Sequence, residues 1–453
     1  MIWSSLKLQK VSPIFWILFL GILLRFALAL VLIDSPERAI HPDTGSYFTV
    51  SYAILTGDGW NYPTAVRTPI YPLFLASGMA VFGENIFALV LLQIFVGTVN
   101  IYFVYKIAQR FFTTKIALVS AFLLAVSIES VTHSIYLLTE TLFVLLFLLS
   151  TYCFAIYFKS GRKQLLFLSG VLLGVAILTR PFIMYYPLFL IVIILFRSDT
   201  FIIRVKEVSL FSLACLMIVT PWVVRNHFVV GIPTVSTISS HNLYFYNALS
   251  YDASKRNIRE DLLLMEYENL LMQNIHDSGL PDTEANRARV ASALAKNIIF
   301  SNPVDYSLNH LKHNANSLLP DTSLLELLGL SYGQKGTLAV LKHSGIFAAI
   351  NHYFEDDGWM ILLLVPSILV LLVSYLGWGI ATVQLFWKRH FFPLVFLSLP
   401  ILYGLMLPGS PSTPRFRVPV MPFLCILAAL GLYCLITYYN KTKRNHEGIP
   451  STL

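Results

Sequence analysis

The sequence predicts an all-α membrane protein, a polytopic helix bundle of about ten spans. Of its 453 residues, 56% are hydrophobic and only 12% are charged, a composition that excludes a soluble domain with a polar surface. Apolar runs that could cross about 30 Å of hydrocarbon as helices also recur along the chain. They lie near residues 14–33, 85–105, 116–135, 137–158, 164–180, 182–196, 207–224, 359–386, 391–407 and 418–439.

The distribution of basic residues predicts the orientation of the bundle. With a cytoplasmic N-terminus, every short inner segment is basic, beginning with Lys7 and Lys10, as the positive-inside rule requires. We therefore expect a multi-pass protein whose N- and C-termini are both cytoplasmic. The net charge of +8 is mainly this orientation signal, and no basic face interleaved with aromatics indicates nucleic-acid binding.

Three regions follow one another along the chain. Residues 1–228 form a transmembrane catalytic module with a first outer loop at 34–83, residues 229–357 form a polar extracytoplasmic segment, and residues 358–453 form the last spans and a cytoplasmic tail. No internal repeat is evident. This argues against the interpretation of the chain as a secondary transporter built from inverted repeats.

The first outer loop predicts two helices at the membrane surface. Asp43 can cap a helix that begins at Thr44 and ends at Gly57. A second apolar segment, 71–82, is too short to span, so we expect it to be re-entrant or interfacial. The first helix carries large apolar side chains on one face, typical of an interfacial helix. They are Tyr47, Phe48, Tyr52 and Leu55.

The polar segment 229–357 predicts a small helical unit. Amphipathic stretches near 257–275, 284–300 and 303–318 are separated by turn residues. Because so short a segment could hardly bury a large core of its own, we expect it to pack on the membrane-embedded part.

Charged residues gather at the predicted outer ends of the spans. Charges near hydrocarbon are costly and usually face a bundle interior, where they serve a function. Helix packing could bring these residues around one cavity. The group comprises Asp43, Arg67, Glu140, Arg180, Arg225, Arg415 and Arg417. The alternatives are helix caps for the two acids and interfacial anchors for the arginines.

A site with one or two carboxylates and several arginines suits one kind of chemistry. A carboxylate can accept the proton of an attacking hydroxyl, while arginine forks stabilise a departing phosphate. We therefore expect transfer from a lipid phosphate to an acceptor outside the cytoplasm.

Four stretches carry a resemblance to a known family. They are HPDTGSY at 41–47, RTPIYP at 67–72, PWVVRN at 221–226 and RFRVPVMPFLCILAAL at 415–430. In these the chain resembles the GT-C polytopic glycosyltransferases, in particular the bacterial branches related to aminoarabinose transferases, protein O-mannosyltransferases and lipopolysaccharide-core glycosyltransferases. Such enzymes take a sugar from a polyprenyl phosphate, with inversion, at the outer face of the cytoplasmic membrane.

The resemblance implies roles for individual residues. Asp43 matches the first-loop aspartate taken as catalytic base, and Glu140 a second carboxylate of the site. The substrate-binding residues that the resemblance implies are Arg67, Arg225 and Arg417, and we expect Tyr47, Arg180 and Arg415 to bind substrate with them. The protein mannosyltransferases have an Asp-Glu pair where this chain has Asp43 and Thr44, which argues against mannose or a protein acceptor. Three classes of acceptor remain as alternatives: a glycolipid, a cell-envelope polysaccharide and a protein.

The histidines do not predict a metal site. His41, His133, His241 and His313 lack the spacing of metal ligands. A divalent ion stays open as a cofactor because some relatives are thought to use one.

The sequence predicts an inverting glycosyltransferase. The alternatives are a transporter or flippase for a lipid-linked saccharide and a non-catalytic scaffold that binds one.

Overall fold

The computed structural model describes residues 12–197, 200–333 and 337–446. Helices and their connections make up these ranges, which contain no β-strand. The expected all-α class is therefore confirmed. Lys7 and Lys10, whose charges help to predict the orientation, lie outside the described residues.

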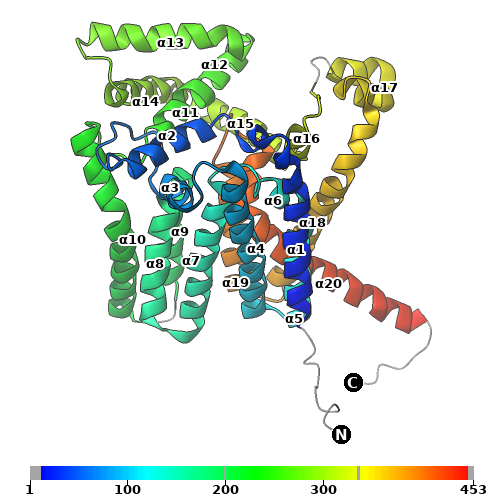
Figure 1. Cartoon of the computed structure of the whole chain (residues 1–453). Coiled ribbons are helices and arrows are strands. Elements are labelled where there is room, and N and C mark those ends of the chain that lie inside the picture. The colour runs from blue at the N-terminus through cyan, green and yellow to red at the C-terminus, as the bar shows by residue number, and fades with distance from the viewer. Residues whose placement is uncertain (1–11, 198–199, 334–336, 447–453) are drawn as a thin grey trace.

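Six helices in the described part of the chain are long and apolar enough to cross a membrane. They are α1 with η1 (Pro13–Ile33), α4 (Ile86–Phe111), α7 (Glu140–Ser160), α10 (Phe201–Val229), η6 with α18 (Gly358–Trp387), and η7 with the first part of α20 (Pro414–Asn440; α20 itself is Met421–His446). Figure 1 shows most of them side by side, with α18 and α20 splayed outward. The chain is thus a membrane protein.

Five further apolar helices are shorter. They are α3 (Ile70–Phe82), α5 (Thr114–Val126), α8 (Lys163–Ile177), η3 with α9 (Pro181–Leu195) and α19 (Phe391–Met406). Four of the ten expected spans fall on such short helices, near 116–135, 164–180, 182–196 and 391–407. The expected count of about ten spans is therefore not confirmed.

The span expected over 116–135 is interrupted. Helix α5 ends at Val126 because Ser127 leaves the helical conformation, with ψ 110°, and its hydroxyl caps the short helix α6 (Ile128–Thr132). The chain then runs without regular helix to Glu140. The buried Gln93 amide holds this stretch by donating to the Tyr136 carbonyl at 2.5 Å.

Two helices of the loop 34–83 lie at one end of the bundle (Figure 1), which we call the outer end because the sequence predicts it to be extracytoplasmic. They are α2 (Thr44–Leu55), which begins and ends as expected, and α3. The Ser51 hydroxyl donates to the Pro72 carbonyl at 3.0 Å and joins the two helices. Gly57, at φ +89°, follows α2 in the left-handed region that favours glycine.

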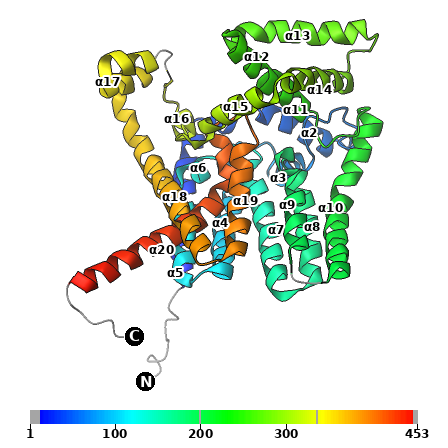
Figure 2. The same cartoon turned by 180° about the vertical axis from the view of Figure 1, so that it is seen from behind.

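The segment between α10 and α18 forms a helical layer over the same end of the bundle, as Figures 1 and 2 show. Its helices are α11 (Ile238–Asn242), the π-helix η4 (Leu243–Ala248), α12 (Leu249–Arg256), α13 (Glu260–Asp277), α14 (Glu284–Ser301), α15 (Pro303–Asn314), η5 (Ala315–Leu318), α16 (Ser323–Leu328) and α17 (Thr337–Tyr353). The three expected amphipathic stretches are α13, α14 and α15 with η5. A small apolar core of its own, around Tyr244, Tyr267 and Leu271, holds the layer together.

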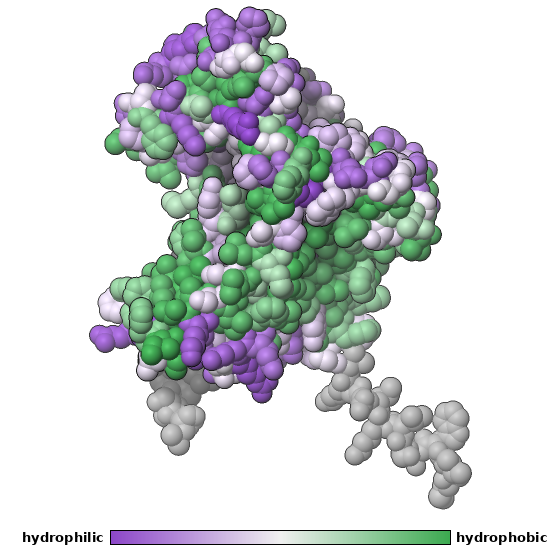
Figure 3. Space-filling model, turned by 90° about the vertical axis from the view of Figure 1, so that its left-hand side faces the viewer, coloured by the Kyte–Doolittle hydropathy of each residue, from purple (hydrophilic) through white to green (hydrophobic). Residues whose placement is uncertain are grey.

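The outer surface of the molecule is banded. Figure 3 shows apolar residues in a middle band between the hydrophilic outer layer and a narrower hydrophilic edge at the opposite end. Inside the bundle residues 421–431 of α20 are buried. A Cβ at Gly377 of α18 would lie 2.7 Å from the Cα of Ala428, so only glycine allows this approach of α18 to α20.

Candidate active site

Five of the predicted site residues form one chain of ion pairs at the outer end of the bundle. Arg67 Nη2 lies 2.7 Å from Asp43 Oδ1, and Arg415 Nη1 lies 2.7 Å from Asp43 Oδ2. Arg415 also donates through Nε to Glu140, which in turn pairs with Arg180. The order Arg67, Asp43, Arg415, Glu140, Arg180 alternates in charge. With three guanidiniums and two carboxylates, the cluster carries a net charge of +1.

Asp43 reaches this cluster because its side chain does not cap α2. The carboxylate makes no capping hydrogen bond, so the alternative of a side-chain cap is wrong. Thr44 fixes the turn instead. Its hydroxyl accepts from the His41 amide at 3.0 Å and donates to the Leu137 carbonyl at 3.1 Å. The Asp43 carboxylate thereby faces the arginines and keeps about a third of its surface exposed.

Arg67 is held in place from its other side by the first turn of α2. Its Nε donates to the Ser46 hydroxyl at 2.7 Å and its Nη1 to the Tyr47 hydroxyl at 3.3 Å. The guanidinium also lies 4.6 Å from the centre of the Tyr47 ring, a cation–π contact. Tyr47 packs edge-on against the buried Tyr71 at 5.0 Å. Tyr47 thus sits beside the cluster as an aromatic support.

The other half of the cluster is buried more deeply. Glu140, at the start of α7, is fully buried, and the Arg180 side chain is 10% exposed. Arg180 lies between α8 and η3, with its guanidinium against the rings of Phe182 and Phe416 at 5.7 and 5.4 Å. Phe416 follows Arg415 on η7 (Pro414–Val420). The buried Glu140 carboxylate thus has cationic partners, as burial of a charge requires; both arginines contact its Oε1, and its Oε2 accepts from the Thr139 hydroxyl.

The arginines control the charge state of Asp43. Burial alone would raise the pKa of its carboxyl, but the guanidiniums of Arg415 and Arg67 outweigh burial and hold the pKa below its ordinary value. Asp43 is therefore a carboxylate at neutral pH. Its two oxygens accept strong charge-assisted hydrogen bonds.

Arg225 does not join the cluster. Its guanidinium donates to the carbonyls of Trp60, Tyr62 and Thr64, with Nε 2.7 Å from the Trp60 oxygen and Nη1 2.8 Å from the Thr64 oxygen. The group also stacks over Trp222 at 4.8 Å. Arg225 thus fastens the loop before Arg67 to the end of α10.

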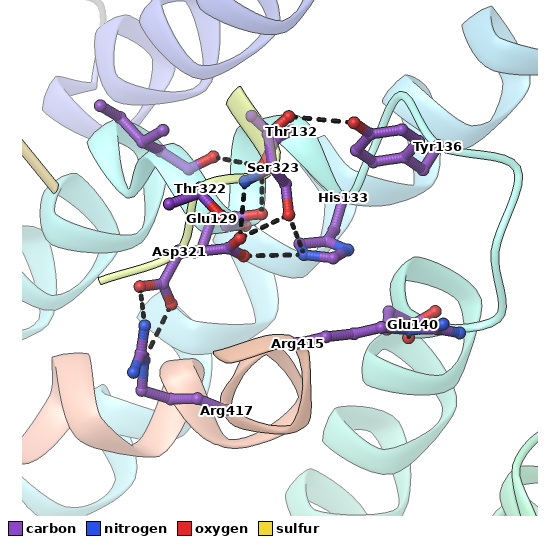
Figure 4. Close-up of polar contacts among 12 residues, drawn as sticks. Glu129, Thr132, His133, Tyr136, Glu140, Asp321, Thr322, Ser323, Arg415 and Arg417 are labelled. Carbon is purple, nitrogen blue, oxygen red and sulfur yellow. Dashed lines mark hydrogen bonds and ion pairs between the residues drawn. The ribbon is translucent and has the colours of Figure 1, made fainter. Parts of the chain in front are cut away.

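Arg417 belongs to a second buried cluster, drawn in Figure 4. Its Nε donates to Glu129 Oε2 at 3.0 Å, and Nη1 donates to the Leu319 carbonyl at 2.8 Å. Arg417 and Arg415 point in opposite directions from η7 in this view. The same short helix therefore serves both clusters.

Asp321 and His133 complete the second cluster. His133 Nε2 lies 2.9 Å from Asp321 Oδ2, and Asp321 also accepts from the hydroxyl and the amide of Ser323. Burial alone would raise the pKa of Asp321, but the hydrogen bond and charge of His133 lower it to about 2. These contacts join the outer layer to α6.

Sequence reasoning missed Glu129, although a signal was present. Glu129 lies inside the apolar run 116–135, and an acid in such a run indicates a buried partner. Asp321 gave no comparable signal, because it lies in a polar segment where an acid is ordinary.

The residues of the first cluster do not fit a divalent cation. The guanidinium of Arg415 bridges Asp43 and Glu140, the position that a metal between two carboxylates would take. Within residues 12–197, 200–333 and 337–446, no three His, Cys, Asp or Glu side chains group as metal ligands.

A cavity of about 470 Å³ borders the loop before Arg67, a size typical of ligand pockets. Val66, α11, η4, α13 and α14 line it. Glu284 at its base accepts from the Thr64 hydroxyl at 2.8 Å and the Ala65 amide at 2.9 Å. Arg287 at its edge is engaged with Asp282 and Glu268. The cavity thus combines apolar walls with paired charges.

The fold and the site together define an all-helical membrane protein with a cationic, ion-paired cluster at one end of its spans. Residues 66–224 match the model of a family described as dolichyl-phosphate-mannose-protein mannosyltransferase. This match includes Arg67, Glu140 and Arg180, whereas Asp43 and Arg415 lie outside it. It confirms the resemblance to the GT-C membrane glycosyltransferases.

Solved structures similar to this chain have low sequence identity to it. The oligosaccharyltransferase of Archaeoglobus fulgidus in the apo form is 15% identical with a TM-score of 0.49, over 99% of this chain and 53% of its own. ArnT from Cupriavidus metallidurans bound to undecaprenyl phosphate is 15% identical with a TM-score of 0.38, over 91% of this chain and 77% of its own. This chain thus spans about half the length of the archaeal enzyme. A comparison with curated proteins found no match.

Proposed function

We propose that the chain is an inverting glycosyltransferase that moves a sugar from a polyprenyl-phosphate donor to an acceptor hydroxyl at the outer face of the cytoplasmic membrane. The single observation that carries this proposal is the ion-pair chain from Arg67 through Asp43 and Arg415 to Glu140 and Arg180. It combines a carboxylate with three cations where lipid and water meet. The family match over residues 66–224 supports a lipid-phosphate donor.

In this proposal Asp43 is the general base. It takes the proton of the acceptor hydroxyl while the hydroxyl oxygen attacks the anomeric carbon from the side opposite the phosphate. The bond from that carbon to the phosphate oxygen breaks, and its electron pair leaves with the polyprenyl phosphate. Arg67, Arg415 and Arg180 offset the charge that develops on the leaving phosphate. Glu140 positions Arg415 and Arg180.

The ion pairs around Asp43 suggest how donor binding prepares this base. Arg67 and Arg415 each place a guanidinium nitrogen 2.7 Å from one Asp43 oxygen. A phosphate anion that binds these arginines competes with Asp43 for their donors. Asp43 then loses part of the positive field that keeps its pKa low and becomes a stronger base.

The family resemblance implies that Arg225 and Arg417 bind the donor. In the proposal they have a different, positioning role. Arg225 uses all its donor groups on carbonyls of the loop 60–64 and on Asn226. Arg417 is engaged with Glu129 and with carbonyls of the outer layer. Both residues position the elements that carry Arg67 and Arg415.

The acceptor approaches from the outer layer in this proposal. The cavity beside Val66 has no unpaired cation among its lining residues, because Arg287 is engaged with two acids. Such a cavity suits an uncharged group better than the donor phosphate. Residues 1–228 and 358–453 then supply the membrane-embedded catalytic part, and residues 229–357 the side that meets the acceptor.

The test compares the wild-type protein with Asp43→Asn in membranes that contain labelled polyprenyl-phosphate sugars and cell-envelope extract. Release of polyprenyl phosphate is measured, together with binding of the donor. We expect Asp43→Asn to lower turnover by about 10²–10⁴-fold, the contribution of a general base, while donor binding persists. Asp58→Asn, an exposed acid of the same loop, is the matched control and should turn over normally.

Two outcomes would contradict the proposal. Equal turnover in Asp43→Asn and wild type would remove Asp43 from the chemistry and direct attention to Glu140. Donor binding without turnover, for every donor and acceptor offered, would favour the transporter or scaffold.

A further inference from the structure

Helix α15 contacts the outer layer through polar side chains, of which Asn314 is buried and Asp305 is exposed. The Tyr251 hydroxyl donates to Asp305 at 3.1 Å, and His313 Nε2 lies 3.2 Å from the Ser250 hydroxyl. Both partners belong to α12, so this side of α15 packs on the outer layer. At its end, Asn314 Nδ2 donates to the Met406 carbonyl at 2.9 Å.

The opposite side of α15 exposes an apolar stripe. It consists of Phe300 at the end of α14 and Val304, Leu308 and Leu311 of α15, which are 71%, 71%, 64% and 49% exposed. The spacing of four and three residues places Val304, Leu308 and Leu311 on one face of α15, and Phe300 precedes them at the end of α14, across the non-helical Asn302. At about 100° per residue, this face lies opposite Tyr306 and His313. In water a helix turns its polar face outward, so α15 has the reverse arrangement.

The position of α15 beside α19 explains this arrangement. Helix α19 has 16 residues, which at about 1.5 Å per residue is about 24 Å, less than the roughly 30 Å of hydrocarbon. Lys388 and Arg389 precede it and hold that end at the headgroups. The other end, Met406, therefore stops short of the opposite headgroups. His310 Nε2, 2.9 Å from the Met406 carbonyl, keeps α15 at that depth.

The end of α19 that α15 contacts also exposes apolar side chains. Leu402, Met406 and Leu407 at this end of α19 are themselves exposed, at 44%, 53% and 37%. Lys312 borders the stripe and is exposed. A lysine beside an apolar face is typical of helices that lie in the membrane interface, where the amine reaches the headgroups.

We propose that the stripe of Phe300, Val304, Leu308 and Leu311 inserts into the hydrocarbon of the lipid leaflet on the side of the outer layer. The occupant of this surface is the acyl region of membrane lipid. Helix α15 then completes the lipid-facing surface above the short helix α19 and anchors the layer of residues 229–357 to the bilayer. This inference is independent of the sugar transfer proposed above.

A spin-label experiment on the full chain in phospholipid vesicles tests the proposal. A nitroxide is attached to Val304→Cys or Leu308→Cys in a variant without Cys153, Cys215, Cys425 and Cys434, and its collisions with oxygen and with a water-soluble nickel complex are measured. The matched control is Met265→Cys on α13, which is 75% exposed. We expect oxygen accessibility relative to nickel to be several-fold higher at 304 and 308 than at 265.

Two results would overturn the proposal. Nickel accessibility at 304 and 308 equal to that at 265 would place the stripe in water. Spin–spin broadening at 308 that disappears on dilution with unlabelled protein would assign the stripe to a second copy of the chain. If the cysteine-free variant does not fold, a photo-crosslinking benzoylphenylalanine at 308 in the native chain replaces the label. Covalent capture of phospholipid at 308 but not at 265 would support lipid contact, and equal capture at both would contradict it.

Discussion

Arg415 is the residue on which the cluster depends, because it is the one that contacts both carboxylates. Its Nη1 pairs with Asp43 and its Nε with Glu140. A planar guanidinium can make two such contacts in fixed directions, whereas a lysine amine is a single point charge on a flexible stem. Position 415 therefore requires the geometry of a guanidinium as well as its positive charge.

We expect Arg415→Lys to lower kcat by about 10²–10³-fold, the cost of removing a donor aimed at developing charge. Polyprenyl-phosphate release under saturating donor is the measurement. Arg259→Lys, an exposed arginine paired only with its neighbour Asp261 in the outer layer, is the control. Equal kcat for Arg415→Lys and wild type would show that charge alone suffices at this position.

The lowered pKa of Asp43 predicts an unusual pH dependence. A base must be deprotonated, so activity is lost on the acid side as pH falls through its pKa. For kcat/KM, which reports the free protein, we expect the acid limb below the ordinary aspartate pKa of about 3.9. For kcat, which reports the donor complex, we expect the acid limb at higher pH. In that complex the donor phosphate draws Arg67 and Arg415 away from the Asp43 carboxylate, so the pKa of Asp43 is higher. Acid limbs at the same pH in both profiles would contradict donor-induced release of Asp43.

Sequence position predicts which residues gather but leaves their pairing open. Asp43 and Arg67 fall in the predicted first outer loop and Glu140, Arg180 and Arg415 at outer ends of predicted spans, and the structure brings them together. The ion pairs depend on side-chain directions that sequence periodicity does not specify. Arg417 is only two residues from Arg415, yet it enters a separate cluster.

At the scale of elements, η7 is the piece that couples the two clusters. Its arginines point to opposite sides (Figure 4), so its placement decides where Arg415 lies. The buried pair of Arg417 and Glu129 holds one side of η7 against α6. Removing one partner of a buried pair leaves an uncompensated charge and costs about 3–5 kcal/mol.

We therefore expect Glu129→Ala to lower the free energy of unfolding by about 3–5 kcal/mol, measured by thermal denaturation in detergent micelles. The double variant Glu129→Ala with Arg417→Met should lose less than the sum of the two single losses, because the pair is coupled. The control is Glu266→Ala, which breaks the exposed pair with Arg256 and should change stability little. A loss for Glu129→Ala no larger than that of the control would show that the pair does not hold η7.

Elements with strong local signals were predictable, and those shaped by tertiary contacts were not. The end of α2 near Gly57 follows from local chemistry, and its start at Thr44 was predicted correctly although the Asp43 side chain does not cap the helix. The break after Val126 was missed, although Ser127, which caps α6, is a local signal for it. Buried Gln93 on α4 holds the stretch that follows, and Glu129 turns toward Arg417.

At the scale of the whole molecule, composition alone predicted a helical membrane protein. The number of full spans was harder to predict, because hydropathy measures apolar length and not the depth at which a helix stops. The short helices α5, α8 and α19 cover their apolar surfaces by packing inside the bundle or beneath the outer layer. Their depth therefore depends on neighbours that are distant in sequence.

These short helices have a consequence for how the chain enters the bilayer during synthesis. Each of α5, α8 and α19 follows a long helix after a turn of two or three residues: α4 before α5, α7 before α8, and α18 before α19. A segment of 13 to 16 residues is too short to span alone. The long helix ahead of it, already inserted, can retain it as the second arm of a hairpin. The chain is thus ordered so that each of these three short helices is made after the long helix that can keep it in the membrane.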